Sequence, residues 1–385
     1  MHAAALSPAP RPALRPRALS CALSCAPSCA LSCALSCALS CALSCASPPP
    51  AAPHHAEGGG FQNLHAPPAH KSFFKFLWMR LRTEWADHAA QGGEVPRVTP
   101  DLRRLAAPPG AQVTWLGHSC FLVQRGGVNL LTDPVFSERA SPVSFAGPRR
   151  YTPNPASAEE LPPLHAVVIS HNHYDHLDTH TIAALAARSP EALWLVPLAN
   201  RALLEGAGVD PARVVELDWW QARALKVGDT EVRLTPTPAQ HWSARGLFDR
   251  NEALWASWAA EWVDPASSSP EGRPWRVFFG GDTGYNELIF KEIGTRLGPF
   301  DLGLIPIGAY APREFMRTMH VDPAEGVRIH HDVGARLSVG AHWGAFPLTA
   351  EPVMEPPARL REALQAAGVP ALDFVTLALG ETRGL

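Results

Sequence analysis

A run of six residues from 171 to 176, with the sequence His-Asn-His-Tyr-Asp-His, constrains this chain more than any other feature. It directly follows an apolar run, residues 165–170, which predicts a strand buried on both faces of its sheet. A loop leaving that strand can aim His171 and His173 at one metal ion while Asp175 and His176 reach a second. Two adjacent ions can activate water and bind both oxygens of a displacement, so the run predicts a two-metal site.

Three further ligand-type residues follow apolar runs later in the chain. His241, Asp282 and His342 each come just after a predicted strand, often beside glycine, which lets the backbone approach a site closely. A lone histidine at a strand end usually has a structural role. The shared placement of these three residues and the 171–176 run is a much rarer coincidence, and it indicates one site.

The chemistry of these side chains suggests how they divide between two ions. One ion would be bound by His171, His173 and His241, and the other by Asp175, His176 and His342. Asp282 is the natural bridge, because one carboxylate can offer an oxygen to each ion. Imidazole and carboxylate ligands suit Zn²⁺ at about 2.0–2.2 Å. No thiolate is in the set, so Mn²⁺ and Fe are compatible with the same ligands.

The order of elements suits a layered α/β domain. Strands are predicted at residues 113–116, 120–123, 128–132, 165–170, 193–196, 232–237, 276–279, 302–306 and 337–340. Helices are predicted at residues 179–187, 201–206, 323–333 and 357–367. The last two begin with proline near the first turn, where its missing N–H costs nothing. Strands dominate the first third and helices interleave afterwards, which favours helices outside the sheets.

The pattern His-x-His-x-Asp-His with downstream His, Asp and His resembles the metallo-β-lactamase superfamily. That resemblance implies an α/β fold of the αββα sandwich type, with two mixed sheets between helix layers and the metals at one sheet edge. Finer matches across residues 61–385 resemble the N-acyl-phosphatidylethanolamine phospholipase D family. They include Trp115–His118, Leu131–Ser137, Gly280–Gly284 and Met319–Glu325.

The second resemblance implies a zinc-dependent phosphodiesterase of the phospholipase D type, with two Zn²⁺ per chain. The substrate would be a phospholipid similar to N-acyl-phosphatidylethanolamine, attacked at phosphorus by a hydroxide that bridges the metals around Asp282. Members of that family are membrane-associated homodimers. The resemblance also implies that His320 lies at the scissile phosphate as a binding or acid–base residue. His118 and Asp133 lie at strand ends near the metal edge. Both are expected either to orient ligands through hydrogen bonds or to cap strands.

Three other functions are compatible with parts of this pattern. A hydrolase of the same fold acting on a soluble phosphorylated lactone or cyclic sugar would differ only in substrate. An RNA-processing nuclease would need a basic surface, but the formal net charge of the chain is −3. Three of its positive charges, Arg11, Arg15 and Arg17, lie before Gly58 and so outside the predicted domain. The remaining body is therefore acidic, and no nucleic-acid partner is expected. A non-enzymatic metal-binding module is disfavoured by the complete ligand set.

Two segments bear on location. Seven of the eight cysteines lie between residues 21 and 45 in an Ala-Leu-Ser-Cys repeat. Residues 1–57 are therefore predicted to be a low-complexity, disordered segment or a misassigned start, with export or anchoring through residues 11–46 as the alternative. Residues 58–385 are predicted to be the hydrolase domain. Basic and apolar residues interleave over 71–82, which predicts either a core helix or peripheral membrane contact. We expect a cytoplasmic or peripheral membrane protein.

Overall fold

The computed structural model describes residues 52–66, 81–263 and 272–385. The predictions for the cysteine repeat and for nearly all of the 71–82 segment lie outside these described residues. Residues 52–385 form one compact unit. Among the described helices, none has both the length and the apolar character that a membrane span requires.

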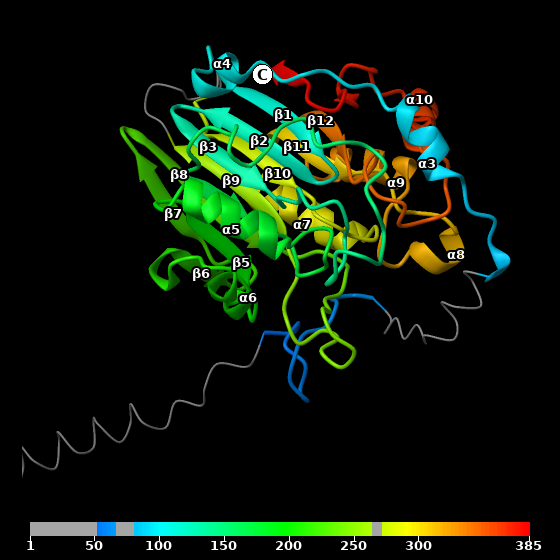
Figure 1. Ribbon diagram of the computed structural model, residues 1–385, viewed down its shortest axis with the longest axis horizontal. Coiled ribbons are helices and arrows are strands. Elements are labelled where there is room, and N and C mark those ends of the chain that lie inside the picture. The colour runs from blue at the N-terminus through cyan, green and yellow to red at the C-terminus, as the bar shows by residue number, and fades with distance from the viewer. Residues whose placement is uncertain (1–51, 67–80, 264–271) are drawn as a thin grey trace, which may run out of the picture. The chain divides into compact units, whose positions relative to one another are not determined.

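Two mixed sheets form the centre of the unit, each with seven strands in the described part of the chain (Figure 1). The first has the order β14 (Thr382–Gly384), β1 (Gln112–Gly117), β2 (Cys120–Arg125), β3 (Val128–Thr132), β4 (Ala166–Val168), β5 (Leu193–Pro197) and β6 (Val214–Leu217). The second has the order β13 (Phe374–Val375), β12 (Ala335–Ala341), β11 (Phe300–Pro306), β10 (Trp275–Phe279), β9 (Ser257–Val263), β8 (Thr230–Thr237) and β7 (Arg223–Val227). In both sheets, parallel pairs occupy one half and antiparallel pairs the other.

Helices flank this pair of sheets in the described part of the chain (Figure 1). In the first half of the chain they are α3 (His88–Gln91), α4 (Leu102–Ala106), α5 (Thr179–Arg188) and α6 (Arg201–Gly206), with 3₁₀ turns at Gly92–Glu94 and Pro211–Arg213. In the second half they are α7 (Glu287–Leu297), α8 (Arg313–Met316), α9 (Pro323–Asp332) and α10 (Glu355–Ala367). Helix α6 contacts β6, and α9 contacts β11, β12, α7 and α10. The predicted αββα sandwich is therefore confirmed.

Local signals account for where the two predicted helices nearest the site begin. Asp178 caps α5, its carboxylate accepting a hydrogen bond from the backbone N–H of His180. Asp322 and Glu325 form a reciprocal capping box at the start of α9, where Pro323 occupies the first turn. Each cap ties a helix start to a loop that comes from the strand-end edge of the sandwich.

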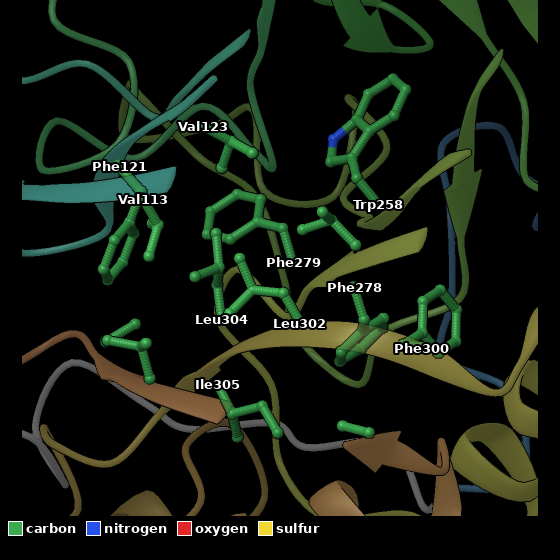
Figure 2. Packing of buried hydrophobic residues seen from close by; sticks show 14 of the residues in the cluster. Val113, Phe121, Val123, Trp258, Phe278, Phe279, Phe300, Leu302, Leu304 and Ile305 are labelled. Carbon is green, nitrogen blue, oxygen red and sulfur yellow. The ribbon is translucent and has the colours of Figure 1, made fainter. Parts of the chain in front are cut away.

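The core lies between the sheets and continues beneath the helices of the second sheet. Figure 2 shows Val123 of β2 near Phe279 of β10 and Leu304 of β11. All seven residues of β11 are buried, because the opposite sheet covers one face and helices cover the other. This double burial explains why the strand is almost continuously apolar instead of alternating.

Residues 52–57, which the sequence pattern places before the hydrolase domain, belong to the compact unit. His54 is buried and its Nε2 lies 2.6 Å from Asp218 Oδ1, while His55 Nε2 lies 2.8 Å from Oδ2 of the same carboxylate. The His54 ring also stacks on Trp219, with ring centroids 4.2 Å apart. No local sequence pattern predicts this contact, because the partner of His54 lies 164 residues away.

We expect residues 52–57 to stabilise the domain. A chain starting at residue 58 should lose about 1–3 kcal/mol of unfolding free energy relative to one starting at residue 52, the usual cost of leaving a buried polar group without its partner. Thermal melts of the two truncations measure this difference in stability. Asp218→Asn in the full chain is a matched variant, because it alters the same contact without shortening the chain. Equal melting temperatures for both truncations would show that the contact contributes nothing.

Candidate metal centre

The predicted ligands meet because their strands end at one edge of the sandwich. His171 follows β4, His241 follows β8, Asp282 follows β10 and His342 follows β12. Strands β10 and β12 are each parallel to β11, and β8 is antiparallel to β9, which is antiparallel to β10. These three strands of the second sheet therefore point the same way, and their carboxyl ends share one edge.

Three imidazoles form the first donor group. His171 Nε2 lies 2.8 Å from His173 Nδ1, and His241 Nε2 lies 3.3 Å from the same atom. All three nitrogens lie within 4.8 Å of one another. This is the set that the sequence assigned to the first ion.

The second donor group contains the predicted Asp175, His176 and His342, together with His118. Asp175 Oδ2 lies 3.3 Å from His176 Nε2 and 3.5 Å from His342 Nε2. His118 Nε2 lies 3.0 Å from the same oxygen. His118 can therefore orient Asp175 or bind an ion beside it, and the group offers one donor more than the sequence assigned.

Asp282 stands between the two groups. Its Oδ2 lies 3.1 Å from His176 Nε2 and 3.8 Å from both His171 Nε2 and His241 Nε2. Its Oδ1 lies 3.0 Å from His342 Nε2. Asp282 therefore lies where a bridging carboxylate would be needed, but a single oxygen, Oδ2, faces both donor groups, whereas the sequence-based prediction gave each ion its own oxygen.

Buried polar atoms without hydrogen-bond partners in the described part of the chain indicate that the donor set fits cations. Buried polar atoms at the site have no hydrogen-bond partner among the described residues, namely His173 Nε2, His176 Nε2, Asp282 Oδ1, His342 Nδ1 and His342 Nε2. Each such atom costs about 1–3 kcal/mol when it stays unpaired. Three of them belong to the contacts around Asp282, where a bound cation would satisfy them together.

The protonation states of Asp282 and of the first donor group suit cation binding. In the second group, carboxylates act against the effect of burial: they raise the pKa of His176, and they raise that of His342 to about 9, so these two must lose a proton when an ion binds. Burial alone would raise the pKa of the Asp282 carboxyl, but the imidazoles facing it hold that pKa well below its usual range. Burial lowers the pKa of His173 to about 3 and that of His241 to about 4. The carboxylate is therefore ionised and these two imidazoles are neutral near pH 7, which are the forms that bind metal.

Asp133 supports two of the ligands from behind. Its Oδ2 lies 2.6 Å from His176 Nδ1, and its Oδ1 accepts a hydrogen bond from the Ser170 N–H at 2.7 Å. The Ser170 hydroxyl donates to Asp133 and lies 2.9 Å from His171 Nδ1. This is the placement expected of a residue that fixes imidazole orientation through hydrogen bonds. Ser170, the intermediary, was not singled out from the sequence.

Backbone strain accompanies this placement. His118, Asp133 and His342 have φ values of 55°, 30° and 60°, in the left-handed region that non-glycine residues avoid. Such a conformation costs of order 1–3 kcal/mol per residue when the surrounding structure enforces it. The His118 carbonyl accepts hydrogen bonds from Trp115 Nε1 and from the His342 N–H, which hold this part of the site in place.

A cavity of about 410 Å³ opens onto the donor groups. Its floor includes His173, Asp175 and Asp282. Its walls are largely apolar, with Trp85, Trp242, Phe315, Met316, Met319 and Leu348 among the lining residues. Trp242 lines this cavity, whereas Trp219, Trp255, Trp258 and Trp262 are buried.

His320 lies in the wall of this cavity and faces the donors. Its Nδ1 is 3.9 Å from Asp282 Oδ2, and its ring centroid is 5.2 Å from that of His241. Burial lowers the pKa of its imidazole well below the usual value. The proximity suits the predicted contact with substrate, and it also makes His320 part of a third potential donor group with His241 and Asp282. Its catalytic role stays a prediction.

One supporting residue left no signal in the sequence. The Asn63 side chain donates to the His241 carbonyl at 2.7 Å and accepts from the His241 N–H at 3.0 Å. The other ring nitrogen of His241, Nδ1, lies 2.9 Å from the Met319 carbonyl oxygen. These contacts join segments far apart in the chain, so only the folded structure brings them to the ligand.

With this geometry established, comparison with known proteins identifies the family. A family model described as a beta-lactamase superfamily domain matches residues 128–343, more than half of the chain. The chain belongs to the metallo-β-lactamase superfamily. The isothiocyanate hydrolase from Delia radicum gut bacteria shares its fold, with a TM-score of 0.53, 19% identity, and coverage of 71% of this chain and 99% of that one.

Two relatives indicate the class of activity. An N-acyl-phosphatidylethanolamine-hydrolyzing phospholipase D of Caenorhabditis elegans is 42% identical over 277 residues, 71% of this chain and 75% of that protein. A metal-dependent hydrolase of Pyrobaculum neutrophilum is 27% identical over 265 residues, covering 67% and 95%. This superfamily member is a metal-dependent hydrolase that resembles N-acyl-phosphatidylethanolamine phospholipase D.

We expect Asp282→Asn to weaken both ion sites at once, because the neutral amide of asparagine cannot replace an oxygen that faces two cations. Elemental analysis of the purified parent should give about two ions per chain, and the variant clearly fewer, with turnover reduced at least about 100-fold. His180→Ala, which removes an exposed histidine outside the donor groups, is the control and should retain the parent metal content. One ion or fewer in fully active parent protein would contradict the two-ion assignment.

Proposed function

We propose that this enzyme is a zinc-dependent phosphodiesterase that hydrolyses N-acylated phospholipids of the N-acyl-phosphatidylethanolamine type. The observation that carries the proposal is the apolar cavity that opens directly onto the buried donor groups. A phosphodiester anion would lie at the cation-binding floor, and acyl chains would contact the aromatic and methionine side chains of the wall. The relationship to the phospholipase of C. elegans supports this choice of substrate.

Zinc is the metal we propose for both sites. The donors are imidazoles and carboxylates, the ligands that Zn²⁺ prefers when no thiolate is present. Mn²⁺ and Fe accept the same ligands, so substitution by each ion belongs in the test. When bound, two such cations would supply activated water and neutralise charge that develops on the phosphate oxygens.

The residues of the chain have separate tasks in this proposal. Asp282, whose Oδ2 faces both donor groups, would bind both ions. Asp133 fixes His176 and, through Ser170, His171, so that the donors need no rearrangement when an ion binds. His320, neutral and beside Asp282, is positioned to bind a phosphate oxygen or to transfer a proton at its imidazole.

The wall of the cavity disfavours the alternative substrate. A soluble phosphorylated lactone or cyclic sugar carries hydroxyl groups that need hydrogen-bond partners when they leave water. Trp85, Phe315, Met316 and Leu348 present mainly apolar surface to the cavity.

We also propose a homodimer and a membrane contact through residues 71–82. Both accompany the phospholipid substrate.

A hydrolysis screen with product masses tests the function. Phospholipids that differ in headgroup and N-acylation should be incubated with the full chain after metal removal and after reloading with Zn²⁺, Mn²⁺ or Fe²⁺. We expect phosphatidic acid and an N-acylethanolamine from the N-acylated substrate, with turnover restored by Zn²⁺. Hydrolysis of phosphorylated lactones or sugars with no phospholipid turnover would refute the proposal and support the alternative.

The role of His320 can be separated from metal binding. We expect His320→Ala to retain two ions and the parent melting temperature while turnover falls about 10²–10⁴-fold, the usual effect of removing a positioned acid–base group. His331→Ala, an exposed histidine on α9, is the matched control and should retain parent turnover. Loss of metal together with activity would instead identify His320 as a ligand.

A further inference from the structure

Two large apolar side chains project from a loop that begins and ends at the substrate cavity. Leu247 is 92% exposed and Phe248 is 91% exposed, the two highest values among the large hydrophobic residues that the structure describes. The loop, residues 243–249, connects Trp242 to Arg250, and both of these residues line the cavity. We call residues 243–249 the rim loop.

The rim loop is closed by its own hydrogen bonds. The Asn251 N–H donates to the Ser243 carbonyl at 2.8 Å, which joins the two ends. Near the tip, the Asp249 carboxylate accepts from the backbone N–H groups of Arg245 at 3.0 Å and Gly246 at 2.8 Å. These bonds fix the turn, so Leu247 and Phe248 are held outward by backbone geometry.

The loop is also attached to the metal-binding segment. Arg245 Nη1 donates to the carbonyls of Asn172 at 2.9 Å and Leu177 at 2.7 Å, and the Tyr174 hydroxyl donates to the Arg245 carbonyl at 2.9 Å. The Arg245 guanidinium lies over the Tyr174 ring, 4.0 Å from its centroid. The exposed tip is therefore in a fixed position relative to the residues that hold the ions.

We propose that the rim loop docks the enzyme on a phospholipid bilayer, with Leu247 and Phe248 entering the acyl region. This inference rests on the proposed function, because a phospholipid that fills an apolar cavity must enter it from a bilayer. A cavity mouth lying against the membrane lets the acyl chains move from one apolar environment to another without crossing water. The rim loop borders that cavity and presents apolar side chains outward.

The charge at the base of the loop fits the same partner. The Arg250 guanidinium lies over the Trp242 ring, 4.2 Å from its centroid, and no ion pair with a described carboxylate accompanies this contact. The phosphate layer of a bilayer lies just outside its acyl region. When the tip enters the acyl region, Arg250 lies at the depth of the phosphates, and a basic side chain there is attracted to an anionic surface.

Vesicle binding of Leu247→Ser/Phe248→Ser in the full chain tests the proposal. Sedimentation with phosphatidylcholine vesicles, with and without phosphatidylglycerol, measures affinity, and bis(p-nitrophenyl) phosphate measures turnover of a soluble diester. We expect vesicle affinity to fall at least about tenfold, since burial of each side chain contributes that much or more, while soluble turnover stays at the parent level. Phe248→Ser alone should give part of the loss and serves if the double variant is unstable.

Leu372→Ser is the matched control. Leu372 is 73% exposed and precedes β13, which pairs with β12 at Ser338, away from the end of β12 that leads to His342. This control should bind vesicles as the parent does. Parent-like vesicle binding by the double variant would overturn the proposal. If the double variant also shifted from dimer to monomer in sedimentation velocity, the tip of the rim loop would be assigned to contact with a second copy of the chain. Vesicle binding without phospholipid hydrolysis would contradict the proposed function and leave the docking surface standing.

Discussion

The structure depends on one electrostatic constraint, a carboxylate buried between two groups of imidazoles. Asp282 Oδ2 faces His171 and His241 on one side and His176 on the other. An ionised carboxylate is costly to bury unless positive charge or hydrogen bonds compensate. The neutral His241 does not supply that compensation, whereas the carboxylates around His176 raise its pKa despite its burial, so positive charge is favoured beside Asp282. Two bound cations would supply that compensation. The strand ends, loops and supporting hydrogen bonds hold these donors in place before the ions bind.

Holding the donors requires support from segments far apart in the chain. Asp133, at the end of β3, fixes His176 and reaches His171 through Ser170. Asn63, from the first described segment, forms two hydrogen bonds with the backbone of His241. Left-handed backbone at Asp133 and at two other residues of the site adds a cost that the rest of the fold must offset. The centre is therefore rigid at the expense of local stability, as expected for a site that binds ions with fixed geometry.

Ion binding and substrate choice are assigned to different parts of the site. The donor groups form the floor of the cavity and are compatible with several hydrolytic reactions. Membership of the superfamily therefore indicates a metal-dependent hydrolase but does not identify its substrate. The walls decide what can lie above the ions, and here they are largely apolar, with Arg250 as a cation at the rim. The rim loop continues this division outward, because its base belongs to the cavity and its tip carries two exposed apolar side chains.

The sequence by itself determined the ligand types, the strands that precede them and the start of α9 at Pro323. His171, His241, Asp282 and His342 were identifiable because apolar runs predict strands and a loop residue after a strand has a defined place. The tertiary structure alone decided which atoms converge, that one Asp282 oxygen faces both groups, that His118 joins the second group, and that His54 and His55 contact Asp218. These features depend on contacts between residues tens to hundreds of positions apart. No local pattern encodes such contacts, because they arise only when two sheets pack and bring their strand ends to a common edge.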